Sequence, residues 1–155
     1  MSPQEIYRFA KIYLALIKEG YSIKDKSAIA SYFLSSPLHF LNQKTGKKYK
    51  HEFSRPIKIK NNSGIFSCGK SVSTAQIVSS SHERELEKYF ILNEGIFIDI
   101  GAHIGKFTIK IAKTLAENGK VISIEPDSIN FSLLKENIEL NKLKNIILKK
   151  VACSD

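Results

Sequence analysis

A short apolar segment followed by two closely spaced glycines constrains this sequence of 155 residues most strongly. The segment 96–100, Ile-Phe-Ile-Asp-Ile, is almost continuously apolar, as expected for a strand buried on both faces of a parallel sheet. Gly101 and Gly105 then bound a tight loop, and apolar residues recur from residue 104 to Leu115 with helical spacing. The sequence therefore predicts a strand, a glycine loop and a helix in succession.

The same alternation continues to the last residue. Residues 121–125 read as a second buried strand, Asp127 or Ser128 caps a second helix, and 146–151 read as a third strand. Strand, helix, strand, helix, strand is half of a doubly wound α/β sheet. We interpret residues 81–155 as part of one α/β domain.

Residues 1–80 have a different character. Ser2-Pro3-Gln4-Glu5 has the form of a capped helix start, and that helix should run to about Glu19. The further elements predicted are a helix over 24–34 ending before Ser36-Pro37, a hairpin with strands at 56–60 and 65–68, a polar loop over 71–81, and a helix over about 82–92. We interpret 1–80 as a helical and hairpin extension.

The excess of positive over negative charge lies entirely in that extension. Residues 1–80 carry 13 Lys and Arg against 4 Asp and Glu, whereas residues 81–155 carry 11 of each. The densest basic segment is 44–60, where seven basic residues oppose only Glu52. Such a segment is able to attract phosphate or another polyanion, although runs of this kind are more often solvated surface. Both interpretations stay open.

The small number of cysteines and the short apolar segments indicate the cellular compartment. Cys68 and Cys153 are far apart and lie in no metal-binding or disulfide pattern, so we expect two free thiols and no metal site. The apolar runs are far shorter than the roughly 20 residues of a membrane-spanning helix. Charged residues within the first apolar segment disfavour a signal peptide. We expect a cytoplasmic protein.

Two acids mark a ligand site at the ends of the predicted strands. Asp99 lies near the end of the first strand, and Glu125 ends the second, 24 positions beyond Gly101. That spacing suits a carboxylate accepting hydrogen bonds from a ribose diol. Gly101 allows a sharp turn, and Gly105 allows a close approach to the first helical turn. We expect the two acids and the loop to form one site.

The loop chemistry discriminates between cofactors. Dinucleotide sites use G-x-G-x-x-G, whereas this loop reads G-x-x-x-G and is preceded by an acid. An acid there repels a diphosphate and attracts a sulfonium or ammonium group. S-adenosylmethionine carries both cations, so the loop suits that cofactor better than NAD. Pro126 has no backbone N–H and leaves that edge open, while His103 either lines the pocket or covers the first helical turn.

Three segments together carry a resemblance to a known family. They are Ile-Asp-Ile-Gly-Ala-His-Ile-Gly-Lys-Phe at 98–107, Ile124-Glu125-Pro126-Asp127, and the downstream Asn137-Ile138 and Leu140-Asn141. This combination resembles the FkbM-type S-adenosylmethionine-dependent methyltransferases. The resemblance covers about residues 83–155, with His103 where the family often has Asn. It implies a partial Rossmann-like methyltransferase sheet, containing three strands of a seven-stranded sheet, with residues 81–155 as its N-terminal half. The implied cofactor-binding residues are Asp99, Gly101, Ala102, His103, Gly105, Glu125, Pro126 and Asp155.

The resemblance also implies roles and an activity. Asp99 and Gly101 would face the methionine end of the cofactor, Glu125 its ribose, and residues 152–155 its adenine. The activity expected first is O-methylation of a small molecule or sugar, with no catalytic base assignable because the C-terminal half is missing. The alternatives are a nucleic-acid methyltransferase, favoured by the basic segment, and a non-catalytic remnant or interaction module. The open edge of strand 96–100 predicts oligomerisation or a complementing chain.

Overall fold

A computed structural model describes residues 2–43, 51–90, 94–115 and 119–153. The chain divides into two compact units, one formed by residues 1–60 and 68–82 and the other by residues 61–67 and 83–155. We call them unit 1 and unit 2 and describe each by itself. Unit 2 contains the glycine loop and both candidate acids.

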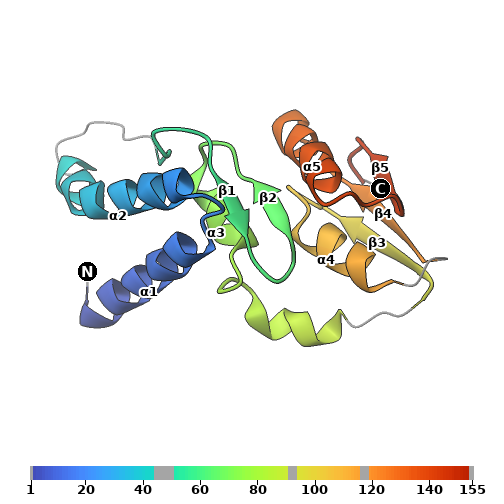
Figure 1. Cartoon of the computed structure of the whole chain (residues 1–155), viewed down its shortest axis with the longest axis horizontal. Helices are drawn as coiled ribbons and strands as arrows, with labels where there is room; N and C mark the ends of the chain where they lie inside the picture. The colour runs from blue at the N-terminus through green and yellow to red at the C-terminus, as the bar shows by residue number, and fades with distance from the viewer. Residues whose placement is uncertain (1, 44–50, 91–93, 116–118, 154–155) are drawn as a thin grey trace. The chain divides into compact units, whose positions relative to one another are not determined.

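Unit 1 is built on two long helices that lie side by side, α1 (Pro3–Glu19) and α2 (Ile23–Gln43) (Figure 1). The predicted capping box is confirmed: the Ser2 side chain accepts from the Glu5 N–H, and the Glu5 carboxylate accepts from the Ser2 N–H. Gly20 ends α1. The core between the helices is apolar and aromatic, and contains Tyr13, Leu16, Ile29, Tyr32 and Phe53.

The prediction that the second helix ends before Ser36-Pro37 is wrong, since α2 continues through Pro37 to Gln43. Proline lacks an N–H, so the carbonyl four residues earlier, that of Phe33, loses its helical donor. The Ser36 hydroxyl donates to that carbonyl at 2.6 Å. A side chain thereby replaces the missing backbone donor, and the helix passes through the proline.

The predicted hairpin is present, with strands β1 (Lys58–Lys60) and β2 (Ile65–Ser67). Its turn is closed by reciprocal backbone hydrogen bonds between Asn61 and Gly64. The Asn61 side chain also accepts from the N–H groups of Ser63 and Gly64, which is the turn chemistry expected of asparagine. Of the basic segment 44–60, residues 44–50 lie outside the described residues.

The polar loop predicted over 71–81 is wrong, because it contains the helix α3 (Val72–Val78). Serine is a good N-cap, and the Ser71 side chain accepts from the Thr74 N–H. Val72, Ala75 and Val78 recur at three-residue steps and are buried. The following segment forms a short 3₁₀ helix, η1 (Arg84–Tyr89), rather than the longer helix predicted over 82–92, of which 91–93 lie outside the described residues.

Unit 2 has the predicted α/β alternation. Its elements are β3 (Ile96–Ile100), α4 (Lys106–Thr114), β4 (Lys120–Ile124), α5 (Ser128–Leu140) and β5 (Ile146–Lys149). The strands are parallel in the order β3-β4-β5. Asp127 caps α5 through hydrogen bonds from the N–H groups of Ile129 and Asn130, as predicted. This is the three-strand part of a Rossmann-like sheet that the sequence pattern predicted.

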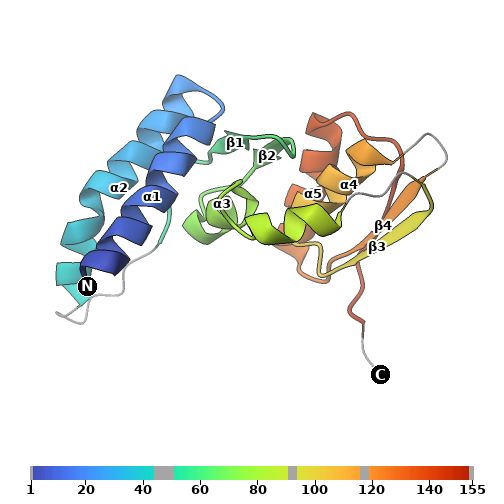
Figure 2. The same cartoon turned by 90° about the horizontal axis from the view of Figure 1, so that it is seen from below.

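Both helices of this sheet lie on the same face (Figure 2). The sheet grows in one direction, and right-handed crossovers then place successive helices on the same side. Ile111, Ala112 and Leu115 pack against Val121 of β4, with the ring of Phe97 beside them. The carboxyl ends of β3 and β4 consequently meet at the N-terminal ends of α4 and α5.

The opposite face of the sheet corrects the expectation that strand 96–100 is buried on both faces. Ile96, Ile98 and Ile100 are 68%, 55% and 66% exposed, and Ile147 of β5 is exposed on the same face. No described residue covers these side chains, and β3 pairs with β4 alone within the described sheet. An apolar strand sequence indicates that burial of its side chains would be favourable, but the neighbouring elements decide whether those side chains are buried.

Candidate functional site

The loop between β3 and α4 has an unusual backbone. Gly101, His103 and Gly105 have positive φ values of 76°, 52° and 94°. The N–H groups of Gly101 and Ala102 both donate to the Ile124 carbonyl, at 2.9 and 3.0 Å, which fixes the loop to the end of β4. A Cβ on Gly101 would meet nothing within 4 Å, so its conformation rather than crowding favours glycine, and the space beside it is open.

Gly105 is required for a different reason. A Cβ there would lie 2.6 Å from Cδ1 of Leu134 on α5. The close approach that the sequence indicated at this glycine is therefore made by a core side chain. Gly105 lets Leu134 of α5 pack against the start of α4.

Glu125 follows β4 immediately and is buried, with 5% of its surface exposed. One carboxylate oxygen, Oε2, accepts from the His103 N–H at 2.7 Å, and the other, Oε1, accepts from the Asp127 N–H at 3.0 Å. The second bond spans Pro126, which has no N–H to offer and is itself exposed. Glu125 thus joins the glycine loop to the start of α5.

Asp99 lies on the helix-covered side of β3, in register with Ser123 of β4. The Thr108 hydroxyl donates to Asp99 Oδ2 at 2.5 Å, and the Thr108 and Ser123 hydroxyl oxygens lie 2.8 Å apart. Since Thr108 gives its proton to Asp99, Ser123 must be the donor to Thr108. Sequence reasoning missed both hydroxyl residues, although a serine within the apolar strand 120–124 was a signal of a polar partner nearby.

The two acids are bound by hydroxyl and backbone N–H groups. Within the described part of unit 2, neither Asp99 nor Glu125 forms an ion pair. Burial raises the pKa of Asp99, the hydrogen bonds from Thr108 oppose that rise, and the charge of Glu125 adds to it. The Coulombic effect shows that both carboxylates contribute to one local field. A cation placed here would relieve their repulsion.

His103 lies within the glycine loop and contacts Glu125. Its backbone N–H holds Glu125, while its Nδ1 is buried and has no hydrogen-bond partner among the described residues. Burial lowers the pKa of His103, against the opposing attraction of Glu125 and Asp127. A buried nitrogen without a partner is uncommon and marks a position where a ligand or water can supply one.

The structure therefore assembles most of the predicted site residues at the carboxyl ends of β3 and β4. Those residues are Asp99, Gly101, Ala102, His103, Gly105, Glu125 and Pro126. Asp155 lies outside the described residues, so its predicted place near adenine stays a prediction. Among the residues that the structure describes, no group of three or more His, Cys, Asp or Glu side chains is placed to hold a metal ion.

The cysteines and the helices of the described residues bear on two further expectations. Cys68 is buried and Cys153 is exposed, and neither forms a disulfide. No described helix combines the length and the apolar character needed to cross a bilayer.

Comparisons with known proteins identify the family. Residues 68–154 match the model of the TRM5/TYW2 methyltransferase domain, which is more than half of the chain. A relative from Sulfurisphaera tokodaii, named probable cobalt-precorrin-6B C(15)-methyltransferase (decarboxylating), is 36% identical over 63 residues. That match covers 41% of this chain and 33% of the relative, so the chain spans about a third of the length of the curated protein it matches.

Solved structures of methyltransferases are also similar. M. jannaschii TYW2 in complex with AdoMet is 30% identical, with 65% of this chain and 44% of that chain covered at a TM-score of 0.47. The M. jannaschii tRNA m1G37 methyltransferase is 26% identical, with 66% and 31% covered at a TM-score of 0.45. By the match over 68–154, the chain belongs to the TRM5/TYW2 methyltransferase domain family, whose cofactor is S-adenosylmethionine.

Proposed function

We propose that this chain carries the cofactor-binding part of an S-adenosylmethionine-dependent methyltransferase that modifies RNA. The family match over residues 68–154 is the observation that carries the proposal. The site chemistry supports it, because two acids that form no ion pair with any described residue lie beside a glycine loop with open space at Gly101. These features fit a ligand that bears both a sulfonium and an ammonium group.

In this proposal Glu125 binds the ribose of the cofactor. Each of its carboxylate oxygens accepts one backbone N–H and retains a lone pair for a ribose hydroxyl. Asp99 and the loop at Gly101 to Gly105 face the methionine end, where the acid attracts the cationic groups. Catalysis would then consist mainly of aligning the methyl group with its acceptor.

RNA replaces the small molecule or sugar that the sequence favoured as acceptor. The family match changes the choice, and the tRNA m1G37 methyltransferase of M. jannaschii shows by its name what one similar protein acts on. The surplus of basic residues in 1–80 has the sign needed to attract a phosphate backbone. The FkbM type was not matched by the family comparison and stays a prediction that rests on the motifs alone.

Calorimetric titration with S-adenosylhomocysteine tests the cofactor site. The wild-type chain should bind, and Glu125→Ala should weaken binding by about tenfold or more, because hydrogen bonds to a charged acceptor are worth about 1.5–3 kcal/mol each. Glu136→Ala, which removes an exposed carboxylate of α5, is the matched control and should bind like the wild type. Equal binding by all three proteins would remove Glu125 from the ribose site.

Transfer of a labelled methyl group tests the acceptor. We expect label from S-adenosylmethionine to enter an unmodified tRNA transcript, and the affinity for that RNA to fall steeply as salt rises. Label found only in small molecules or sugars would restore the first expectation. Cofactor binding without transfer to any class of acceptor would favour the non-catalytic interpretation.

A further inference from the structure

Asn137 of α5 is a fully buried amide that contacts two separate parts of unit 2. Its Oδ1 accepts from the Ser67 N–H at 2.6 Å, and its Nδ2 donates to the Ser67 carbonyl at 3.2 Å. The same Nδ2 donates to the carbonyl of Ile104, inside the glycine loop, at 2.9 Å. One side chain therefore holds β2 and the loop together.

Asn141, one helical turn later, repeats only half of this arrangement. Its Oδ1 accepts from the Ile65 N–H at 3.1 Å, and its Nδ2 donates to the Ile65 carbonyl at 2.7 Å. Four residues of helix rise about 6 Å and two residues of strand about 6.6 Å, so side chains at i and i+4 match backbone groups at i and i+2. The two asparagines imitate the edge of a neighbouring strand, but the hydrogen-bond partners of Asn141 among the described residues lie outside the loop.

The Ile104 carbonyl is bound by α5, whereas the N–H groups of the loop are bound by other groups. The N–H groups of Gly101 and Ala102 are held by β4, that of His103 by Glu125, and that of Gly105 by the Ala102 carbonyl. The Asn137 amide fixes the peptide that joins Ile104 to Gly105 through its carbonyl oxygen, opposite the Gly105 N–H. Without it, a buried carbonyl would lack this donor, and a rotation of that peptide would displace the residues on both sides.

We propose that Asn137 is a positioning residue for cofactor binding, which fixes the Ile104 peptide of the glycine loop and ties it to β2. Residues 61–67 precede the family match at 68–154, yet through Asn137 the β2 backbone is part of the support of the loop. This inference rests on the proposed binding of the cofactor at that loop. It assigns Asn137 no contact with the cofactor.

The test compares Asn137→Ala with Asn141→Ala. Both variants lose two hydrogen bonds to β2. Asn137→Ala also loses the bond to the loop, whereas Asn141→Ala instead loses the bonds of Asn141 with Lys113 Nζ and with the Asn137 carbonyl. Without ligand, hydrogen exchange at the amides of His103 and Gly105 should become at least about tenfold faster in Asn137→Ala and change less than about threefold in Asn141→Ala. Calorimetry should show the same order for the affinity for S-adenosylhomocysteine, with about a tenfold loss for a buried group left unpaired.

The outcomes separate this inference from the function. If the wild-type chain does not bind S-adenosylhomocysteine, the proposed function fails, while the exchange measurement still decides the role of Asn137 in the loop. If both variants change exchange and affinity equally, Asn137 is only part of the β2 attachment and the inference is wrong. Should Asn137→Ala fail to fold, Asn137→Ser keeps one donor and should give intermediate values by the same measurements.

Discussion

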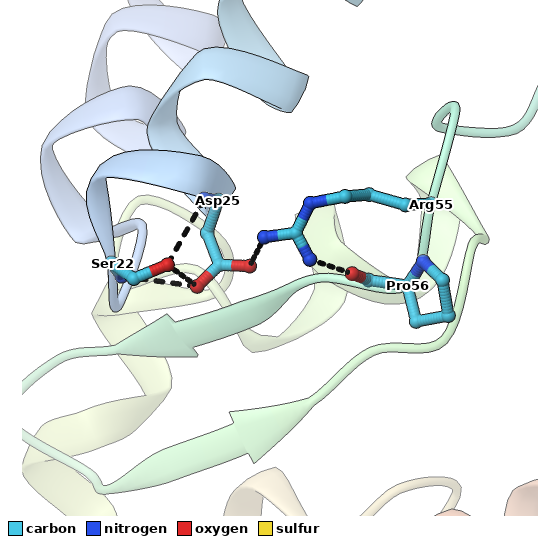
Figure 3. A network of polar contacts seen from close by, with 4 residues as sticks. All are labelled: Ser22, Asp25, Arg55 and Pro56. Carbon is cyan, nitrogen blue, oxygen red and sulfur yellow. Dashed lines mark hydrogen bonds and ion pairs between the residues drawn. The ribbon is translucent and has the colours of Figure 1, made fainter.

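The two units of this protein treat their acidic side chains in different ways. In unit 1, Asp25 is buried and forms an ion pair with Arg55 at 2.8 Å (Figure 3). In unit 2, Asp99 and Glu125 are held by hydroxyl and backbone N–H groups and face no cation among the described residues. The buried carboxylate of Asp25 is therefore paired with a cation, whereas those of Asp99 and Glu125 are available to a cationic ligand.

The carboxylate of Asp25 is bound by neighbouring residues of unit 1. Asp25 Oδ2 accepts from the N–H and the hydroxyl of Ser22, which caps the start of α2, while Oδ1 accepts from Arg55. The other terminal nitrogen of Arg55 donates a hydrogen bond to the Pro56 carbonyl. These bonds, drawn in Figure 3, hold α2 to the segment before β1.

The largest effect on stability should follow the loss of that carboxylate. Asp25→Ala removes the carboxylate that accepts from the capping Ser22 and leaves Arg55 without its partner, and should lower the free energy of unfolding by about 2–3 kcal/mol. Urea denaturation followed by circular dichroism measures it. Binding of S-adenosylhomocysteine below the transition should be unchanged, and a parallel loss of affinity would contradict the separation of roles between the units.

The second-largest effect should be a difference in stability between substitutions on the covered face and on the open face of the sheet. Val121→Ala removes methyl groups from the packed face and should cost about 2 kcal/mol, whereas Ile98→Ala on the open face should cost less than about 1 kcal/mol. Thermal melts of the two variants measure the difference.

Solubility gives a second readout of the open face. Ile98→Ala should also make the chain more soluble or less oligomeric in sedimentation, because it reduces an exposed apolar surface. A cost for Ile98→Ala as large as that for Val121→Ala would mean that this face is covered in solution.

The pH dependence of Asp99→Asn should be smaller but diagnostic. The folded pKa of Asp99 is raised above 3.8, so the ionised carboxylate opposes folding, and this cost appears as pH rises through the folded pKa. An amide at this position can still accept from Thr108. The variant should therefore gain stability relative to the wild type between about pH 4 and about pH 7. Thermal melts across that range measure the difference, and a relative loss would show that a cation already pairs with Asp99.

The smallest effect is expected from His103→Asn. Asparagine tolerates the left-handed backbone better than most residues and keeps the N–H that binds Glu125, so stability at neutral pH should change by less than about 1 kcal/mol. The affinity for S-adenosylhomocysteine should change by less than about threefold if His103 only covers the first turn of α4. Calorimetry decides, and a tenfold loss would place its imidazole against the cofactor.

The sequence by itself determined the elements whose signals are local. The Ser2 capping box, the strands and helices of the α/β alternation and the cap at Asp127 could be predicted because each depends on neighbours within a few residues. The same holds for the glycine loop and Glu125, where turn chemistry and strand ends dictate the residue types. The loop over 71–81 and the end of α2 were missed, since Ser71 and Ser36 act as caps or substitute donors that composition alone does not distinguish.

The tertiary structure decided the contacts between segments distant in sequence. Only packing shows that Leu134 occupies the space at Gly105, that Thr108 and Ser123 hold Asp99, and that Asn137 links the loop to β2. It also decides that Ile98 is exposed although its neighbours along the chain are apolar. The burial and the hydrogen-bond partners of a residue depend on which segments pack against it in space. The periodicity of the sequence predicts local helices and strands but not those distant neighbours.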